Sequence, residues 1–278
     1  MERECITMCN QKISKFNIED LNKHAKHFSM LISAKRRTGK SVLCHDFLFH
    51  MRDWGFNKVI LISESAGAGQ EAYKPIDPRL MYNNLTDELL QSIWNQQEID
   101  KAKDPEHKIL VILDDVIGDM KKIRSMKNLG KFATLGRHNN ISYIAICQYY
   151  KSFPKVFRDN SDLIVFFITT CEEDRKEVLE RFCSVKSGAE SKRLAHEVFQ
   201  FITSEPYRAL VVRNYLSQAR ELPDVMSWYK AQPIATFPEF QLYHDQYEDV
   251  KEPKKFQLNG LNFNVRPIRK INTRIPFL

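Results

Sequence analysis

The sequence predicts an α/β protein with a mostly parallel central sheet that is covered by helices on both faces. Apolar runs of strand length recur along the chain, and segments with helical periodicity separate them. Each run is continuously apolar rather than alternating, as expected for strands that are buried on both faces. The stretch "SAKRRTGKSVL" then joins the first apolar run to the first helical pattern, in the place and form of a phosphate-binding loop.

Six segments are predicted to be strands because they are short, apolar and rich in β-branched residues. They are residues 27–33, 57–63, 107–115, 141–148, 161–169 and 207–214. The last residues of such parallel strands meet at one edge of the sheet, where open α/β folds bind their ligands. The loop that begins after Ser33 starts at this edge.

Five segments are predicted to be helices, at residues 40–51, 87–102, 123–136, 172–183 and 191–202. In the first of them, Leu43, Phe47 and Met51 share one face. Thr86 is a good N-cap for the second, which has acidic residues in its first turn. Beyond Pro223 the pattern predicts no element, so the sequence divides into an N-terminal extension (1–26), a nucleotide-binding domain (27–222) and a C-terminal extension (223–278).

Composition and charge limit the classes of protein to which this chain can belong. The longest apolar stretch, Leu163–Ile168, is far too short to span a membrane, and residues 1–10 carry no apolar secretory core. The six cysteines have no C-x-x-C spacing, which predicts reduced thiols in an intracellular protein. Of the formal net charge of +7, residues 251–278 carry seven Lys or Arg against one Glu. That basic tail either contacts nucleic-acid phosphates or is a solvated arm, which docks on a neighbouring subunit or remains disordered.

The loop matches G-x-x-x-x-G-K-[ST] except that Ala34 stands at the first glycine position. Alanine is the smallest residue with a Cβ, so this departure is sterically mild. Gly39 allows a sharp backbone at the helix entry, Lys40 can reach the β- and γ-phosphates, and Ser41 can place its hydroxyl on Mg²⁺. The residues expected to line the nucleotide are Ala34, Lys35, Arg36, Arg37, Thr38, Gly39, Lys40, Ser41 and Val42. The alternative is a basic surface loop that matches the motif by accident.

Two further strand ends carry polar side chains. Asp114 and Asp115 end the apolar run "ILVILDD", and Gln148 ends "SYIAICQ". Next to a phosphate loop, Asp114 is expected to hold Mg²⁺ through water, and Asp115 to orient or deprotonate the attacking water. Gln148 is expected to sense the γ-phosphate or to position the water. The alternatives are a turn or helix cap for the acids, and a strand-end amide that bonds the next turn for Gln148.

Four segments together resemble the genome-packaging ATPases of poxviruses and other nucleocytoplasmic large DNA viruses, within the FtsK–HerA superfamily. These segments are "AKRRTGKS", "VILDD", "LGRHNNISYIAICQ" and "FRDNSDLIVFF". The resemblance covers about residues 28–214. It implies a RecA-like P-loop NTPase fold, the cofactors ATP and Mg²⁺, a homo-oligomeric ring, and translocation of double-stranded DNA into a preformed capsid. It also implies work at the viral assembly site in the host cytoplasm, presence in the virion, and a capsid or membrane-associated virion partner.

Carried over to this sequence, the resemblance places the phosphate residue at Lys40 and the magnesium residue at Ser41. It places the acid that holds the metal through water at Asp114, and the polar sensor at Gln148. Asp115 stands where many members of the superfamily have glutamate, which leaves the identity of the catalytic base open. For the arginine finger from a neighbouring subunit, Arg137 is favoured and Arg158 is the second choice.

The basic segment 119–131 is a candidate DNA contact, through Lys121, Lys122, Arg124 and Lys127. Its alternative is a solvated helix face. Two other functions remain open from the sequence. One is an FtsK–HerA-type ATPase for other DNA transfer or export, and the other is a non-catalytic nucleotide-binding assembly factor.

Overall fold

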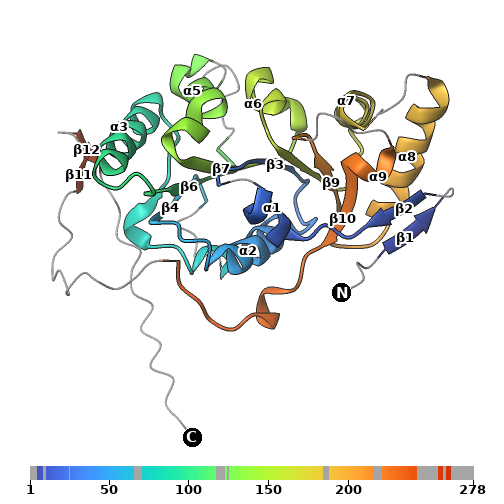
Figure 1. The fold of residues 1–278 in the computed structure, drawn as a ribbon, viewed down its shortest axis with the longest axis horizontal. Coiled ribbons are helices and arrows are strands. Elements are labelled where there is room, and N and C mark those ends of the chain that lie inside the picture. Colours follow the sequence, from blue (N-terminus) through green and yellow to red (C-terminus); the bar gives the residue numbers. More distant parts are fainter. Residues whose placement is uncertain are drawn as a thin grey trace, which may run out of the picture.

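One mixed sheet of eight strands forms the centre of the protein in its computed structural model (Figure 1). The structure describes residues 5–8, 11–24, 26–65, 71–116, 123, 125–183, 188–215, 221–242, 256–258 and 261–263. Across the sheet the strands lie in the order β10-β9-β8-β3-β7-β6-β4-β5. In chain order they are β3 (Ser29–Ser33), β4 (Lys58–Ser63), β5 (Met81–Tyr82), β6 (Ile109–Asp114), β7 (Ile141–Cys147), β8 (Leu163–Phe166), β9 (Arg208–Arg213) and β10 (Met226–Lys230).

Strand β3 lies inside the sheet and pairs in parallel with β7 on one side and β8 on the other. Beyond β7, strands β6, β4 and β5 continue the parallel arrangement. Strands β9 and β10 are antiparallel to their neighbours on the other flank. Strand β7 therefore separates β3 from β6, and the polar ends of all three strands reach the same edge of the sheet.

Helices cover both faces of the sheet, as the sequence predicts. Figure 1 shows α3 (Asp87–Lys103), α5 (Lys127–Leu135), α6 (Lys155–Asp159), α7 (Glu172–Phe182) and α8 (Ala189–Thr203) above the sheet. On the other face lie α1 (Ile18–His24) and α2 (Lys40–Met51). The short helix α9 (Leu222–Val225) precedes β10. Thr86 caps α3 as expected, because its hydroxyl accepts the N–H of Leu89 at 3.1 Å.

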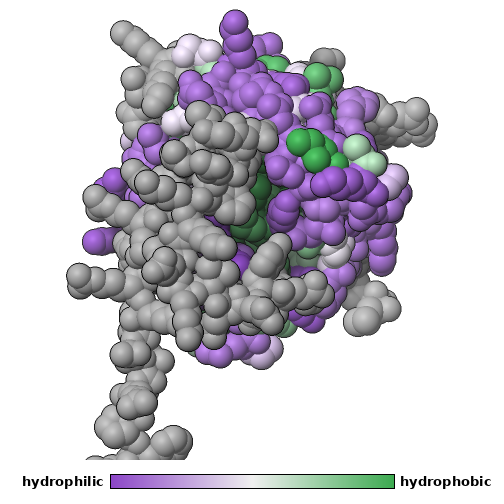
Figure 2. Space-filling view, turned by 90° about the vertical axis from the view of Figure 1, so that its left-hand side faces the viewer, coloured by the Kyte–Doolittle hydropathy of each residue, from purple (hydrophilic) through white to green (hydrophobic). Residues whose placement is uncertain are grey.

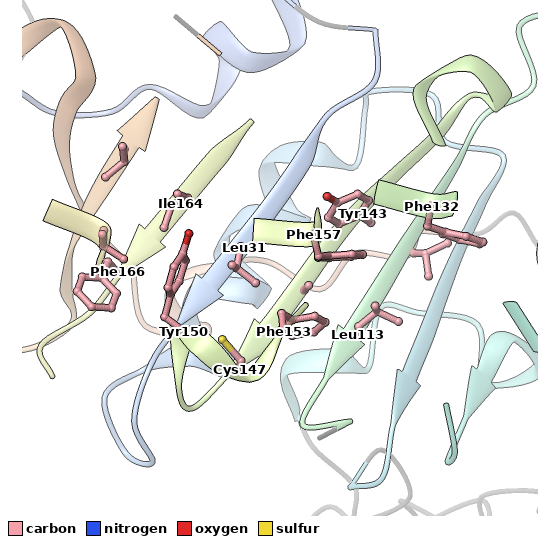
Figure 3. Packing of buried hydrophobic residues seen from close by; sticks show 14 of the residues in the cluster. Leu31, Leu113, Phe132, Tyr143, Cys147, Tyr150, Phe153, Phe157, Ile164 and Phe166 are labelled. Carbon is pink, nitrogen blue, oxygen red and sulfur yellow. The ribbon is translucent and has the colours of Figure 1, made fainter. Parts of the chain in front are cut away.

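Two apolar layers hold these helices on the sheet, because successive strand residues point to opposite faces. Leu31 belongs to the layer under α3, α5 and α6, whereas Met30 and Ile32 belong to the layer under α2. Figure 3 shows part of the first layer, where Phe153 and Phe157 stack at 5.1 Å near Leu31. On the side of the molecule drawn in Figure 2, the coloured surface is mostly hydrophilic, in keeping with an apolar interior.

The structure adds elements at both ends of the chain that the sequence pattern does not predict. Strands β1 (Cys5–Met8) and β2 (Gln11–Ser14) form a hairpin, and β11 (Phe256–Leu258) pairs with β12 (Leu261–Phe263). Strand β10 lies beyond the expected domain boundary at residue 222, yet it extends the main sheet. Phe16 donates its N–H to the carbonyl of Trp228 at 2.7 Å, so the N-terminal segment contacts β10. The division into three parts stays a prediction, but the sheet itself continues past its second boundary.

The described cysteines, Cys5, Cys44, Cys147, Cys171 and Cys183, are all free thiols. Burial raises the pKa of the Cys147 thiol to about 12, so this group stays protonated beneath the carboxyl edge of the sheet. In the described part of the chain, none of the helices combines the length and apolar character needed to cross a membrane.

Candidate nucleotide-binding site

The phosphate loop connects β3 to α2 at the carboxyl edge of the sheet. Ala34 donates its N–H to the carbonyl of Cys147 at 2.9 Å, which extends the pairing of β3 with β7 by one residue. Its side chain is 2% exposed and packs in the layer under α2. Ala34 has a negative φ, so its Cβ is not strained there. The alanine at the first glycine position therefore fits the loop.

Gly39 ends the loop in a conformation that only glycine adopts readily. Its φ is 103°, and α2 begins at the next residue. A Cβ at this position would lie 2.6 Å from Cδ1 of Tyr207, which is a clash as well as a backbone strain. Thr38 tightens the turn by donating its hydroxyl to the carbonyl of Lys35 at 2.8 Å. Gly39 thus lets the chain enter α2 with the helix amino terminus open to an anion.

The basic side chains of the loop differ in their surroundings. Lys35 is half-buried, and its ammonium contacts the hydroxyl of Thr170, which follows β8. Arg36 and Arg37 are exposed, and Arg37 has a φ of 65°. Ser41 and Val42 lie in the first turn of α2. The loop therefore offers positive charge around a helix amino terminus, which is the arrangement that binds phosphate.

The predicted acid pair lies beside the phosphate-loop lysine. Lys40 Nζ is 3.1 Å from Oδ1 of Asp114 and 3.8 Å from Oδ1 of Asp115. The Asp114 side chain is 1% exposed, whereas that of Asp115 is 38% exposed. Asp114 is the last residue of β6, and Asp115 turns the chain out of the strand with a φ of 54°. One carboxylate therefore faces the loop from within the protein, and the other faces solvent above it.

Tyr73 fixes the second oxygen of Asp114, which the sequence analysis does not predict. Its hydroxyl donates to Oδ2 of Asp114 at 2.7 Å. Burial raises the pKa of Tyr73 well above its ordinary value, so the phenol remains a donor at neutral pH. The segment that carries Tyr73 packs against α2, since His45 Nδ1 lies 3.0 Å from the carbonyl of Ala72. With Oδ2 occupied, Oδ1 of Asp114 is the oxygen that faces Lys40.

Gln148 joins the same group from β7. Its amide nitrogen donates to Oδ1 of Asp115 at 3.0 Å. This proximity follows from the strand order, because β7 lies between the strands that precede the loop and the acid pair. The structure therefore brings together Lys40, Asp114, Asp115 and Gln148, four of the residues that the sequence predicts for one site.

The oxygen donors near the loop fit a hard divalent cation better than a transition metal. Ser41 offers a hydroxyl and Asp114 a buried carboxylate, and Mg²⁺ in nucleotide sites uses one or two such protein groups together with phosphate oxygens and water. Among the described residues, no cluster of three His, Cys, Asp or Glu side chains forms a metal cage. Any metal here would thus be held jointly by the protein and a phosphate ligand.

The two arginines proposed as fingers lie away from this group. Arg137 is exposed in the turn of Gly136–Asn139 that precedes β7, at the amino edge of the sheet. Arg158 ends α6 and precedes β8, at that same edge. The Arg158 side chain is 11% exposed, contacts Glu177, and donates its Nε–H to the carbonyl of Phe153 at 3.1 Å. Neither arginine reaches the phosphate loop of its own chain, which is consistent with a role only toward a neighbouring subunit.

The basic segment after the acid pair is described only in part. Lys121, Lys122 and Arg124 lie outside the described residues. Lys127 is exposed at the first position of α5. Its proposed contact with DNA therefore stays a prediction.

Comparison with solved structures finds the same fold in viral genome-packaging proteins and in a conjugation coupling protein. The genome packaging NTPase B204 of Sulfolobus turreted icosahedral virus 2, in complex with ATP-gammaS, is 15% identical, with a TM-score of 0.52 over 75% of this chain and 98% of that one. The DNA-packaging ATPase B204 of Sulfolobus turreted icosahedral virus gives a TM-score of 0.55 at 16% identity, over 75% and 98% of the two chains. The pCW3 conjugation coupling protein TcpA gives 0.52 at 13% identity, over 82% of this chain and 64% of that one. The predicted P-loop NTPase fold is thereby confirmed.

Sequence comparison leads to viral proteins as well. Protein L437 of Acanthamoeba polyphaga mimivirus is 25% identical over 222 residues, which cover 76% of this chain and 75% of that protein. The family model described as "Poxvirus A32 protein" matches residues 13–252, a span that contains the phosphate loop, the acid pair, Gln148 and Tyr73. The chain therefore belongs to the poxvirus A32 protein family.

Proposed function

We propose that this protein is an ATP-driven motor that translocates double-stranded viral DNA into a preformed capsid during virion assembly. The observation that carries the proposal is the position of Lys40 at the amino terminus of α2, directly after Gly39. Its ammonium lies 3.1 Å from Asp114 and 3.8 Å from Asp115. Membership of the poxvirus A32 protein family and likeness to the viral packaging ATPase B204 support the DNA-packaging role.

The side chains around the loop are suited to different parts of phosphoryl transfer. The amino terminus of α2 and Lys40 would bind the phosphates, and Ser41 with Asp114 would hold Mg²⁺. The bound cation would supply charge neutralisation on the phosphoryl oxygens. Asp115 is the exposed carboxylate, so it is placed to accept a proton from water, and Gln148 holds it in position through the 3.0 Å hydrogen bond.

The shorter carboxylate at position 115 is compatible with this role. Its positive φ moves the Asp115 side chain above the strand end, where it is both exposed and fixed by Gln148. Ala34 is likewise accommodated without strain. These two departures from the common motif therefore give little support to the alternative of a non-catalytic assembly factor.

A ring would complete the site with an arginine from the next subunit. Arg137 is the better candidate because it is exposed, whereas Arg158 would first have to leave Glu177 and the carbonyl of Phe153. We further propose that the protein works at the cytoplasmic assembly site of the virus, together with a capsid or membrane-associated virion partner.

The proposal is tested by measuring ATP hydrolysis by the full chain with and without linear double-stranded DNA. The same protein is then given DNA that carries a triplex-forming third strand, which a translocating motor displaces. We expect DNA to accelerate hydrolysis and the third strand to be released only when ATP is present. Hydrolysis that DNA does not accelerate would contradict a DNA motor. ATP binding without turnover would instead favour the assembly factor.

A further inference from the structure

Tyr207 adopts a backbone conformation that is rare for an aromatic residue. It lies in the turn between α8 and β9, with a φ of 63°. Two hydrogen bonds hold the turn, from the N–H of Arg208 to the carbonyl of Glu205 and from the N–H of Ala231 to the carbonyl of Tyr207, both at 3.3 Å. Positive φ values of this kind concentrate where a protein must place one side chain at a functional site.

The turn places the Tyr207 ring against the phosphate loop. Strand β9 is antiparallel to β8, so its first residues lie at the carboxyl edge of the sheet, where the loop also begins. The Cδ1 and Cε1 atoms of the ring lie 2.6 and 3.4 Å from the position that a Cβ on Gly39 would occupy. The Tyr207 ring therefore fits against the loop because Gly39 has no side chain.

The rest of the ring is open to solvent. Tyr207 is 51% exposed, which is unusual for a large apolar side chain that the backbone holds in a strained turn. Arg36 and Arg37, on the same loop as Gly39, are exposed as well, and Glu205 in the turn pairs with Arg208 and Lys230. If the loop anchors the phosphates of a nucleoside triphosphate, Tyr207 is an exposed aromatic ring beside that loop and can meet the base.

We propose that Tyr207 is the platform on which the base of the bound nucleoside triphosphate stacks. This inference rests on the proposed function, because it assumes that the loop anchors the phosphates. An aromatic ring offers a flat, apolar surface to a nucleobase, and it does so without reading the hydrogen-bonding edge of the base. The loop would thus bind the phosphates, and Tyr207 would add affinity that depends on the base.

The test compares two ligands that share phosphates and differ in the base. Binding of ATP and of inorganic tripolyphosphate, each with Mg²⁺, is measured by calorimetry on the full chain. Tyr207→Ala should weaken ATP binding by about tenfold to a hundredfold and leave tripolyphosphate binding unchanged. Tyr207→Phe should bind ATP as the wild type does. Phe201→Ala, which removes another exposed aromatic ring from the end of α8, is the matched control and should change neither ligand.

Several outcomes would contradict the proposal that the base stacks on Tyr207. If Tyr207→Ala weakens the binding of ATP and of tripolyphosphate equally, the ring only shapes the loop. If it weakens the binding of neither ligand, the base lies elsewhere. Lys40→Ala tests the proposed nucleotide site separately from the stacking platform. This variant should bind neither ATP nor tripolyphosphate. A Lys40→Ala protein that binds both ligands as the wild type does would contradict the nucleotide site itself and the platform with it.

Discussion

Gly39 is the residue on which the shape of the phosphate loop depends most directly. Its φ of 103° and the ring of Tyr207 both exclude a side chain. Gly39→Ala should therefore reduce ATP affinity by at least about tenfold, because a strain of about 1–3 kcal/mol would reshape the loop. Gly55→Ala is a matched control, since Gly55 also has a positive φ of 75° but has room for a Cβ. Equal ATP affinity in the two variants, measured by calorimetry, would contradict this account of the loop.

Tyr73 contacts Asp114, the residue proposed to hold Mg²⁺, so we expect it to affect the metal requirement rather than nucleotide binding. Tyr73→Phe removes the 2.7 Å hydrogen bond to Asp114, so the carboxylate is less well oriented. We expect the Mg²⁺ concentration for half-maximal ATP hydrolysis to rise about tenfold to a hundredfold. Tyr150→Phe is the control, because the buried Tyr150 hydroxyl has no hydrogen-bond partner within the described residues. An unchanged Mg²⁺ requirement in Tyr73→Phe would show that Tyr73 serves packing alone.

The residues that sequence could predict are those fixed by strand ends. Asp114, Asp115 and Gln148 lie at the ends of apolar runs, and parallel strands bring such positions together. Lys40 is recognised from the phosphate-loop motif that follows the first apolar run. Tyr73 and Tyr207 could not be predicted, because their contacts depend on the paths of a long connection and of a turn. Arg137 and Arg158 precede the predicted strands 141–148 and 161–169. This position puts both arginines at the opposite edge of the sheet, away from the phosphate loop of their own chain.

At the scale of elements, helix α2 is held by contacts with β10 and with the chain that follows β10. Its Asp46 is fully buried and accepts the hydroxyl of Tyr229 at 2.9 Å and the N–H of Gln232 at 2.7 Å. Phe237 then packs on Phe49 of the same helix, with ring centroids 4.6 Å apart. The chain after β10 thus forms a strap, residues 231–242, that fastens the helix of the nucleotide site to β10.

Asp46→Ala should lower the free energy of unfolding by about 2–4 kcal/mol, because it leaves the buried hydroxyl of Tyr229 and the part-buried N–H of Gln232 without an acceptor. Asp53→Ala, at an exposed position that pairs with Arg52, should change it by less than about 0.5 kcal/mol. Urea unfolding followed by circular dichroism measures both. A similar small effect of the two substitutions would mean that the strap contributes little to the stability of α2.

The main elements were predictable because continuous apolar runs and helical periodicity are strong local signals. The structure confirms all six predicted strands and all five predicted helices, with small shifts at their ends. Strand β10 was not predicted, because "MSWYK" is short and follows a proline-containing segment. This segment is a strand because it pairs with β9, and the local sequence does not reveal such a long-range contact.

At the scale of the whole molecule, the proposed fingers Arg137 and Arg158 lie at the edge of the sheet opposite the phosphate loop. In a head-to-tail ring, the amino edge of one subunit can approach the carboxyl edge of the next. Proteins carrying Lys40→Ala or Arg137→Ala should each hydrolyse ATP poorly. When they are co-assembled, about a quarter of the interfaces would regain both groups, and a similar share of wild-type activity should return.

The control for this mixing experiment is Lys40→Ala co-assembled with the double variant Lys40→Ala, Arg137→Ala, which restores no complete interface. ATP hydrolysis by the mixtures is the readout. A mixture that stays as inactive as its two components would contradict Arg137 as the finger and leave Arg158 as the candidate to substitute next.

The most direct test of the central claim is the rate of ATP hydrolysis in the presence of saturating double-stranded DNA. Lys40→Ala should lower this rate by about a hundredfold or more, and Asp115→Asn by about 10²–10⁴-fold with ATP binding retained. Lys74→Ala, an exposed lysine whose side chain pairs with Glu71, should leave the rate unchanged. If Lys40→Ala hydrolyses ATP as fast as the wild type does, then the group formed by Lys40, Asp114, Asp115 and Gln148 is not the site of ATP hydrolysis.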